Sequence, residues 1–362
     1  TIIDGDFNGD DAVIRSEQNF WQYNNYGDNT RTLIFAVLND SSYLFDGILF
    51  RAGQGGRRGG AILASGNDST VEIRRCVFVD NRLDSEIRPW DGGGAINSSA
   101  DFLVIDSCVF LGNQAFFRGG AIAVYTAPPG ENCDLTGDPV DALVVNSVFS
   151  GNQASEGGAA VVYACGGAEV MCRFVNCTFA GNKAAGFGSA VTTLGWGSAE
   201  IVNSVVFGNR DVPLHPGSPQ WQLWRNPSDF GTLFVDHCIV ESVLEEPSVI
   251  FGSFGRLNVN PEFFDARGED GFAGTADDNL RVSSTSEAVE MGSEQYLPSG
   301  VTTDIDGVFR IIDGDGDMTP SLDMGAYEAQ PGCPTCPGAR VWVEPMGGSF
   351  HELSNWDVGV PL

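Results

Sequence analysis

The strongest constraint on the fold is a six-residue phrase that recurs along the chain and ends in asparagine. Each copy has Cys or Ser first, Phe or Val third, Gly or Asp fifth and Asn last. The copies end at Asn81, Asn113, Asn152, Asn182 and Asn209, which are 32, 39, 30 and 27 residues apart. A Gly-Ala or Ser-Ala phrase repeats in step with them. A period of this length, with several short strands in each repeat, indicates a β-solenoid in which each repeat forms one coil.

Stacked coils account for the residues in the phrase. Equivalent positions in neighbouring coils of a solenoid lie about 4.8 Å apart, the spacing of strands in a sheet. We therefore expect Phe to stack on Phe in a narrow core, and Asn to form a hydrogen-bonded ladder along a turn. The resulting fold class is all-β, a parallel β-helix of about ten coils if each coil takes about 30 residues.

The Gly-Gly-Ala-Ile and Phe-x-x-Asn phrases resemble the right-handed parallel β-helix repeats of bacterial surface proteins. The chlamydial polymorphic outer-membrane proteins are among them. The resemblance covers about residues 1–330 and is strongest at 45–245. It implies a right-handed helix and an exported location, but says little about activity, because function lies in sites rather than in folds.

The last part of this region resembles the ending of secreted β-helix proteins that carry variable C-terminal surface anchors. Three segments carry that likeness: residues 278–293, 304–310 and 323–328. The chain departs from the pattern at Ser286-Glu287-Ala288, where that ending commonly has Ser-Pro-Ala.

Three parts of the chain follow from these patterns. Residues 1–330 form the β-helix, with clear repeats at 45–245 and an acidic closing region at 246–330. Residues 331–340, which include "PGCPTCPG", are a linker. Residues 341–362 begin a further extracellular β-module or supply a strand that is exchanged with a neighbour. The chain starts as if within a strand, so we expect a segment of a longer protein.

The net charge of −29 limits the partners of the chain. Nucleic acid is excluded, because its binding needs clustered Lys and Arg. No apolar run is long enough to span a membrane as a helix. So many like charges repel one another unless salt screens them or cations bind them. Bound Ca²⁺, high external salt and solubility are therefore three alternative explanations for the acidic composition.

Acidic segments with the spacing of calcium loops are the candidate metal sites. At the N-terminus, Asp4, Asp6 and Asn8 alternate as oxygen ligands of a hard cation do, but Arg15 stands where an EF-hand has glutamate. The preferred candidate is a later cluster: Asp304, Asp306, Asp313, Asp315 and Asp317. A third cluster has Asp270, Asp277 and Asp278. The alternative for all three is a solvated turn, which Asp and Gly also favour.

Four of the nine cysteines share the first position of the phrase with serine: Cys76, Cys108, Cys177 and Cys238, beside Ser147 and Ser204. Exchange with Ser predicts buried, unreactive thiols in a tight interior. One disulfide is expected among Cys133, Cys165 and Cys172 in an oxidising compartment, with Cys165–Cys172 as the first choice. Cys333 and Cys336 form a lone C-x-x-C pair, for which a local disulfide or free thiols are expected rather than zinc.

The variable segments after each asparagine stack on one side of a solenoid, where a β-helix enzyme would carry its active site. Their acidic residues do not line up, and His215, His237 and His351 are scattered. Aromatic residues do line up. The candidate surface for a sugar or a partner protein therefore comprises Trp90, Phe116, Phe117, Arg118, Phe187, Trp221 and Trp224. The alternative is that the 210–231 insertion folds back over its neighbours' rings.

These patterns favour a structural or adhesive segment of a larger exported, cell-surface or extracellular protein of bacterial type. We expect self-association or contact with a neighbouring surface protein, with Ca²⁺ as a stabilising ion. The alternatives are a polysaccharide lyase or glycoside hydrolase, and a carbohydrate-binding β-helix without catalysis. Released sugars would indicate the enzyme, and glycan binding lost on Trp221→Ala or Trp224→Ala would indicate the binding module.

Overall fold

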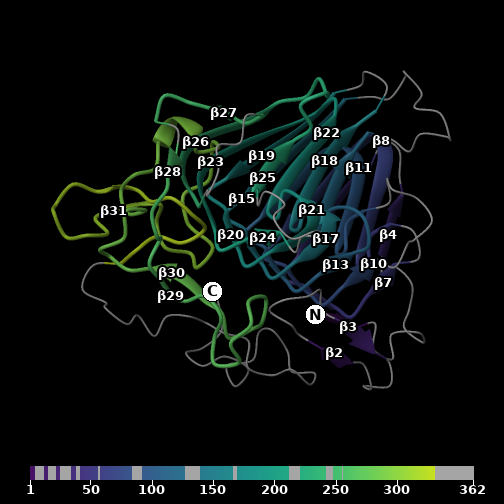
Figure 1. The fold of residues 1–362 in the computed structure, drawn as a ribbon, viewed down its shortest axis with the longest axis horizontal. Helices are drawn as coiled ribbons and strands as arrows, with labels where there is room; N and C mark the ends of the chain where they lie inside the picture. The colour runs from purple at the N-terminus through teal and green to yellow at the C-terminus, as the bar shows by residue number, and fades with distance from the viewer. Residues whose placement is uncertain are drawn as a thin grey trace.

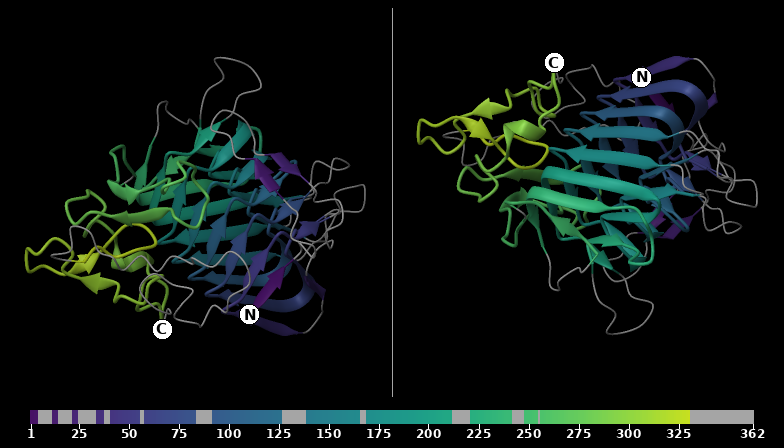
Figure 2. Two further views of the ribbon diagram at one scale, coloured as in Figure 1. Left: turned by 90° about the horizontal axis from the view of Figure 1, so that it is seen from below. Right: turned by 90° about the horizontal axis from the view of Figure 1, so that it is seen from above.

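The chain forms a parallel β-solenoid, confirming the predicted fold class (Figures 1 and 2). The computed structural model describes residues 1–4, 12–14, 22–24, 34–37, 41–55, 58–83, 92–126, 139–165, 169–211, 221–241, 248–254 and 256–330. The helix in this part is one 3₁₀ turn, η2 (Glu294–Tyr296). No helix among the described residues is long and apolar enough to cross a membrane.

Each complete coil contributes four strand positions, and equivalent strands of successive coils pair in parallel. The first position is held by β5 (Ser42–Asp46), the second half of β8 (Ile62–Arg74) and of β11 (Ile96–Asp106), β15 (Val140–Val145), β19 (Val170–Val175), the first half of β23 (Gly197–Phe207) and of β26 (Leu233–Val240), and β27 (Ile250–Phe251). The second is held by β1 (Ile2–Asp4), β6 (Leu49–Arg51), β9 (Val77–Val79), β12 (Val109–Leu111), β16 (Val148–Ser150), β20 (Thr178–Ala180), the ends of β23 and β26, and β28 (Arg256–Leu257).

The third and fourth positions complete the coil. The third forms a six-stranded sheet of β7 (Gln54–Gly55), β10 (Arg82–Leu83), β13 (Gln114–Ala115), β17 (Gln153–Glu156), β21 (Lys183–Phe187) and β24 (Arg210–Asp211). The fourth is held by β4 (Ile34–Val37), the first half of β8 and of β11, β14 (Ile122–Tyr125), β18 (Ala160–Ala164), β22 (Val191–Gly195) and β25 (Leu223–Arg225).

Three antiparallel pairs lie outside these stacks: β2 (Ala12–Ile14) with β3 (Gln22–Asn24), β29 (Phe263–Asp265) with β30 (Asn279–Val282), and β31 (Ile311–Ile312) with β32 (Ser321–Leu322).

The solenoid is shorter than the ten coils predicted from length. The structure supports about five turns: the six-stranded sheet takes five steps from β7 to β24, and the other three stacks continue beyond it at the ends. The estimate failed because it assigned all of residues 1–330 to coils. Residues 259–330, here called the lateral region, lie beside the stack instead (yellow-green in Figure 2). The predicted linker and module at 331–362 lie outside the described residues.

The phenylalanine ladder is present. Adjacent rings in the core are stacked, with centroids 4.7–4.9 Å apart and planes within 7° of parallel. The ladder consists of Phe50, Phe78, Phe110, Phe149 and Phe179. All five side chains are fully buried, so they fill the interior from coil to coil.

The asparagine ladder is present too, and it holds the turn between the second and third strands. The side-chain amide of Asn113 donates to Oδ1 of Asn152 (2.9 Å) and to the carbonyl of Phe78 (3.0 Å). The backbone amide of Asn113 also donates to Oδ1 of Asn152 (3.0 Å). Equivalent bonds recur at Asn81, Asn152 and Asn182. The ladder ends where Asn209 donates to Oε1 of Gln222 (2.7 Å).

Cysteine and serine exchange at the first position of the phrase because both make the same hydrogen bonds. Sγ of Cys108 donates to the carbonyl of Asp106 (3.3 Å) and accepts from the amide of Cys76 (3.4 Å). Oγ of Ser147 donates to the carbonyl of Val145 (2.8 Å) and accepts from the amide of Cys108 (3.1 Å). The described phrase cysteines are buried free thiols, as predicted.

The predicted Cys165–Cys172 disulfide is wrong. Cys172 is a free, buried thiol in β19, where its side chain faces the core between Ala142 and Ala199. Cys165 follows β18 and is disulfide-bonded. All other described cysteines are free, so the partner of Cys165 lies outside the described residues.

The lateral region is attached to the stack through asparagines that the sequence analysis did not single out. The residue before each Cys or Ser of the phrase has a φ of 48–55°, and three successive coils place Asn there: Asn146, Asn176 and Asn203. Asn is enriched in this left-handed conformation. Their side-chain amides donate to the carbonyls of Thr303 (2.9 Å), Asp323 (3.0 Å) and Ser293 (3.0 Å), respectively.

Candidate functional site

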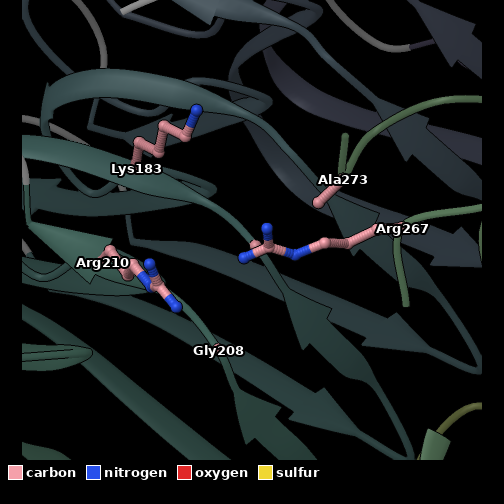
Figure 3. A pocket seen from close by; sticks show the side chains of 6 residues that line it. Lys183, Gly208, Arg210, Arg267 and Ala273 are labelled. Atoms are coloured by element: carbon pink, nitrogen blue, oxygen red, sulfur yellow. The ribbon is translucent and has the colours of Figure 1, made fainter. Parts of the chain in front are cut away.

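A small pocket between the stack and the lateral region is lined by three cationic side chains. Its described lining comprises Gly181, Lys183, Gly208, Arg210, Arg267 and Ala273. Lys183 and Arg210 approach from the neighbouring strands β21 and β24, and Arg267 extends toward them from the opposite side (Figure 3). The cavity volume is about 20 Å³, which is room for one water molecule or one small charged group.

The register of the third stack sets this arrangement. Lys183 lies directly opposite Arg210 on one side and Gln153 on the other. Lys183 is only 7% exposed, whereas Arg210 is exposed. The pocket was not predicted from sequence. The sequence signal for it is the residue that follows each asparagine of the phrase. These residues pair from coil to coil in the third stack, so cationic residues in successive copies lie side by side.

The lateral region forms the other wall of the pocket. Ala273 lies so close to Gly151 and Gly181 that a Cβ on either glycine would overlap it. Both glycines have φ near 64°, so the turn needs glycine for conformation as well as for space. Arg267 comes from the same loop and is thereby placed beside β21.

Part of the predicted calcium cluster does come together, with one residue that was missed. Carboxylate oxygens of Glu290, Asp313, Asp315 and Asp317 all lie within 4.8 Å of one another. Burial raises the pKa of Glu290 and the three aspartates raise it further, while the amide of Gly314 opposes the shift. No sequence pattern pointed to Glu290, because it lies more than 20 residues from the aspartates.

Asp304 and Asp306 do not join that cluster. Asp304 is buried and accepts hydrogen bonds from the amides of Asp306 (2.9 Å), Val308 (2.8 Å) and Glu328 (2.9 Å). Asp306 forms a two-pronged ion pair with Arg281, with both N–O distances 2.7 Å. Both carboxylates are therefore occupied in holding the backbone of the lateral region.

The N-terminal and third acidic clusters are engaged in protein contacts where they are described. Asp4 forms an ion pair with Arg51 (2.5 Å), while Asp6 and Asn8 lie outside the described residues. In the third cluster, Asp278 accepts from Ser150 (2.6 Å) and from the amide of Gly274 (2.6 Å). Burial raises the pKa of Asp278 to about 7.

The predicted aromatic row divides into two separate groups. Phe187 contacts Trp224 (centroids 4.7 Å apart) and Trp221 (5.5 Å), so the described end of the 210–231 insertion lies against its neighbour's ring. Phe116 and Phe117 contact each other edge to face (4.8 Å). The remaining member, Trp90, lies outside the described residues.

Arg118 is held by its own coil neighbours. Its Nε donates to Oε2 of Glu156 (2.9 Å), and its guanidinium lies 5.2 Å from the ring centre of Tyr163. Arg118 and Glu156 are also paired through their backbones. Glu156, an acidic residue of the next variable segment, is thus the ion-pair partner of Arg118.

Comparisons with known proteins add no assignment: no protein-family model, curated protein or solved structure matches this chain. The fold is therefore established by the chain's own strand pairing, and the candidate sites by the geometry above.

Proposed function

We propose that the chain is a rigid structural or adhesive segment of a larger exported surface protein. The supporting observation is the continuity of the side-chain ladders through successive coils. The four coils that contain β9, β12, β16 and β20 each carry a stacked Phe ring, an asparagine of the ladder and a buried Cys or Ser at the first position of the phrase. A solenoid built this way is a stiff, quasi-one-dimensional object, which suits a spacer or an adhesive stalk.

Two features support an exported location. Cys165 is disulfide-bonded, and disulfides persist mainly in oxidising compartments outside the cytosol. The net charge of −29 keeps an extended surface segment soluble. The bacterial surface repeats that the phrases resemble are exported as well.

Self-association is part of this proposal. At the C-terminal end of the stack, β27 and β28 each pair only with β26 among the described strands. The end of a stack of parallel strands can accept another strand, from a second copy or from a neighbouring surface protein.

We further propose that Ca²⁺ binds at Glu290, Asp313, Asp315 and Asp317. Calcium takes carboxylate oxygens at 2.3–2.6 Å, so two ligands of one ion lie at most about 5 Å apart. The four carboxylates meet this condition. They come from two segments of the lateral region, so an ion would tie those segments together and offset the crowding of like charges.

The function is tested on cells that produce the complete protein. Protease added to intact cells is expected to remove the segment, and an antibody against it should label unbroken cells. Sedimentation velocity over a concentration range then measures self-association. A segment found only in the cytosolic fraction would contradict the export proposal, and a monomer at every concentration would contradict self-association.

The calcium proposal has its own measurement. Calcium at about 100 times its Kd stabilises a binding protein by about 2.7 kcal/mol, so the melting temperature should rise by several degrees. Asp315→Asn should remove this rise. Asp265→Asn is the matched control, because exposed Asp265 accepts only from the amide of Arg267 (3.3 Å), and asparagine retains that acceptor. An equal rise in both variants would contradict the site.

A further inference from the structure

We propose that the outer face of the first stack of strands is a contact surface for a second copy of this chain. This outer face comprises the outward side chains of β5, β8, β11, β15, β19, β23, β26 and β27. The proposal rests on the self-association proposed above and deepens it. It adds a side-by-side contact to the end-to-end one and names the residues that form it.

The middle of the outer face is more apolar than a sheet surface in water normally is. Every second residue of a strand points outward, and outward residues of a solvated face are usually polar. Of the first two outward positions of β11, β15 and β19, six in all, four are apolar: Phe102, Val104, Leu143 and Met171. Phe102 is 53% exposed and Met171 38%. Leu44 and Ile250, toward the two ends of the stack, are exposed as well.

Strand pairing gathers these side chains into one patch. Phe102 and Met171 both lie opposite Asp141, one coil to either side of it. Val104 lies opposite Leu143 in the next column. Single apolar residues on a surface are ordinary, whereas a contiguous apolar patch marks an interaction site.

The lateral region already covers one edge of the same surface. The third outward residue of β15, β19 and β23 is a buried valine, and Tyr296 and Val301 pack against these valines. Leu143, two residues before the valine of β15, contacts the same cluster but stays partly exposed. The apolar surface therefore continues past the point where the lateral region ends.

Charge favours a second copy as the partner. Two copies with a net charge of −29 repel each other least where their charges are already paired. Three ion pairs lie on the outer face or at its edge: Glu72–Arg74, Asp46–Arg75 and Arg173–Glu200. The other outward charges of these strands are Asp106, Asp141 and the buried Asp236. A basic partner would instead be drawn to the acidic remainder of the molecule.

The size and symmetry of the contact define the expected assembly. The stack has eight strands, and β5 is five residues long. Strand spacing and rise then give a face of roughly 34 Å by 16 Å, or at most about 1,100 Å² for two copies, the size of a weak interface. Both copies use the same face, so the contact closes at a dimer, whereas end-to-end addition of strands continues.

Sedimentation equilibrium of the complete chain over a range of concentrations tests the contact. A chelator is present, so that no Ca²⁺ bridges the acidic copies. Phe102→Glu and Met171→Glu each place a charge in the apolar patch and should weaken dimerisation about tenfold or more. Both side chains are exposed, so the variants should fold, which thermal unfolding of dilute protein checks.

Phe116→Glu is the matched control. Phe116 is 47% exposed but directly follows β13, in the third stack, so this variant should dimerise as the unmodified chain does. Added salt should tighten the dimer, because it screens the repulsion between two acidic copies.

The outcomes distinguish this contact from self-association in general. Association that Phe102→Glu and Met171→Glu leave as strong as Phe116→Glu would overturn the contact and leave end-to-end association standing. A dimer that dissociates as salt is added would also overturn it, because opposite charges would then hold the copies together. A monomer at every concentration would overturn both the contact and the proposed self-association.

Discussion

The first position of the repeated phrase selects a side chain that both donates and accepts a hydrogen bond. Sulfur and oxygen make the same two contacts there, to a carbonyl two residues earlier and to an amide of the neighbouring coil. Burial raises the pKa of Cys177 to about 12, so that thiol stays protonated at neutral pH and is a weak nucleophile.

Cys108 provides the residue-scale prediction. Cys108→Ser should change the free energy of unfolding by less than about 1 kcal/mol, because the hydroxyl keeps both hydrogen bonds. Cys108→Val should cost about 2 kcal/mol, because it loses these bonds and adds volume to a filled interior. Urea unfolding of both variants measures the difference. Equal losses would show that side-chain volume alone governs the position.

At the scale of elements, one set of stacked strands serves two purposes. The turn before the third strand points asparagine into the stack, where it forms the ladder. The next residue of each coil lies on the strand itself and builds the polar column that includes Lys183 and Arg210. A shift of one residue would exchange these roles, so the asparagine ladder also fixes the position of the cationic pocket.

The element-scale prediction concerns the phenylalanine ladder. Phe110→Ala should cost about 3–5 kcal/mol of stability, because Phe110 is fully buried between Phe78 and Phe149 and the cavity interrupts the stack. Phe230→Ala is the control, since Phe230 is 71% exposed and contacts the ring of Trp196. Denaturant midpoints compare them. Similar losses in both variants would argue against the ladder as the main source of cohesion.

At the scale of the whole molecule, a buried polar core joins the lateral region to the stack. Arg310 is 1% exposed and donates to Oδ1 of Asn146 (Nε, 3.1 Å), to Oε1 of Glu328 (2.7 Å) and to two backbone carbonyls. Burial raises the pKa of Asp304 to about 6. Burial and then Asp323 raise the pKa of Glu328 to about 9, with Arg310 opposing both.

These shifts predict that stability falls as pH rises. Asp304 and Glu328 bind a proton more tightly when folded than when unfolded, where their pKa values are about 3.9 and 4.3. Their contribution is fully present below pH 4 and is lost as pH rises through about 6 for Asp304 and about 9 for Glu328. Between pH 5.5 and 8.5 the loss should be on the order of 4 to 5 kcal/mol, most of it from Glu328.

Denaturant unfolding in chelator measures this dependence without a contribution from metal binding. Glu328→Gln should be less stable at pH 5.5, because it disturbs the contact with Arg310, but its stability should depend less on pH. Asp141→Asn is the control, since exposed Asp141 lies on β15 in the stack, and it should follow the unmodified protein. Stability that increased toward pH 8.5 would contradict the assignment.

The sequence by itself determined the repeating part of the protein. Each copy of the phrase carries the same residues at the same strand and turn positions, so the Phe ladder, the Asn ladder and the buried Cys or Ser position could all be predicted. These contacts join equivalent residues of adjacent coils, so an alignment of the repeats identifies which residues pair.

Only the tertiary structure decided what lies beside the coils. The lateral region has no repeat, so nothing in its sequence indicated that Glu290 would meet Asp313, that Asp304 would be buried apart from them, or that Arg267 would face Lys183. Such contacts join segments up to 164 residues apart, as between Asn146 and Arg310. They depend on how a segment without repeats packs against the solenoid, and a repeat pattern in the sequence contains no information on that packing.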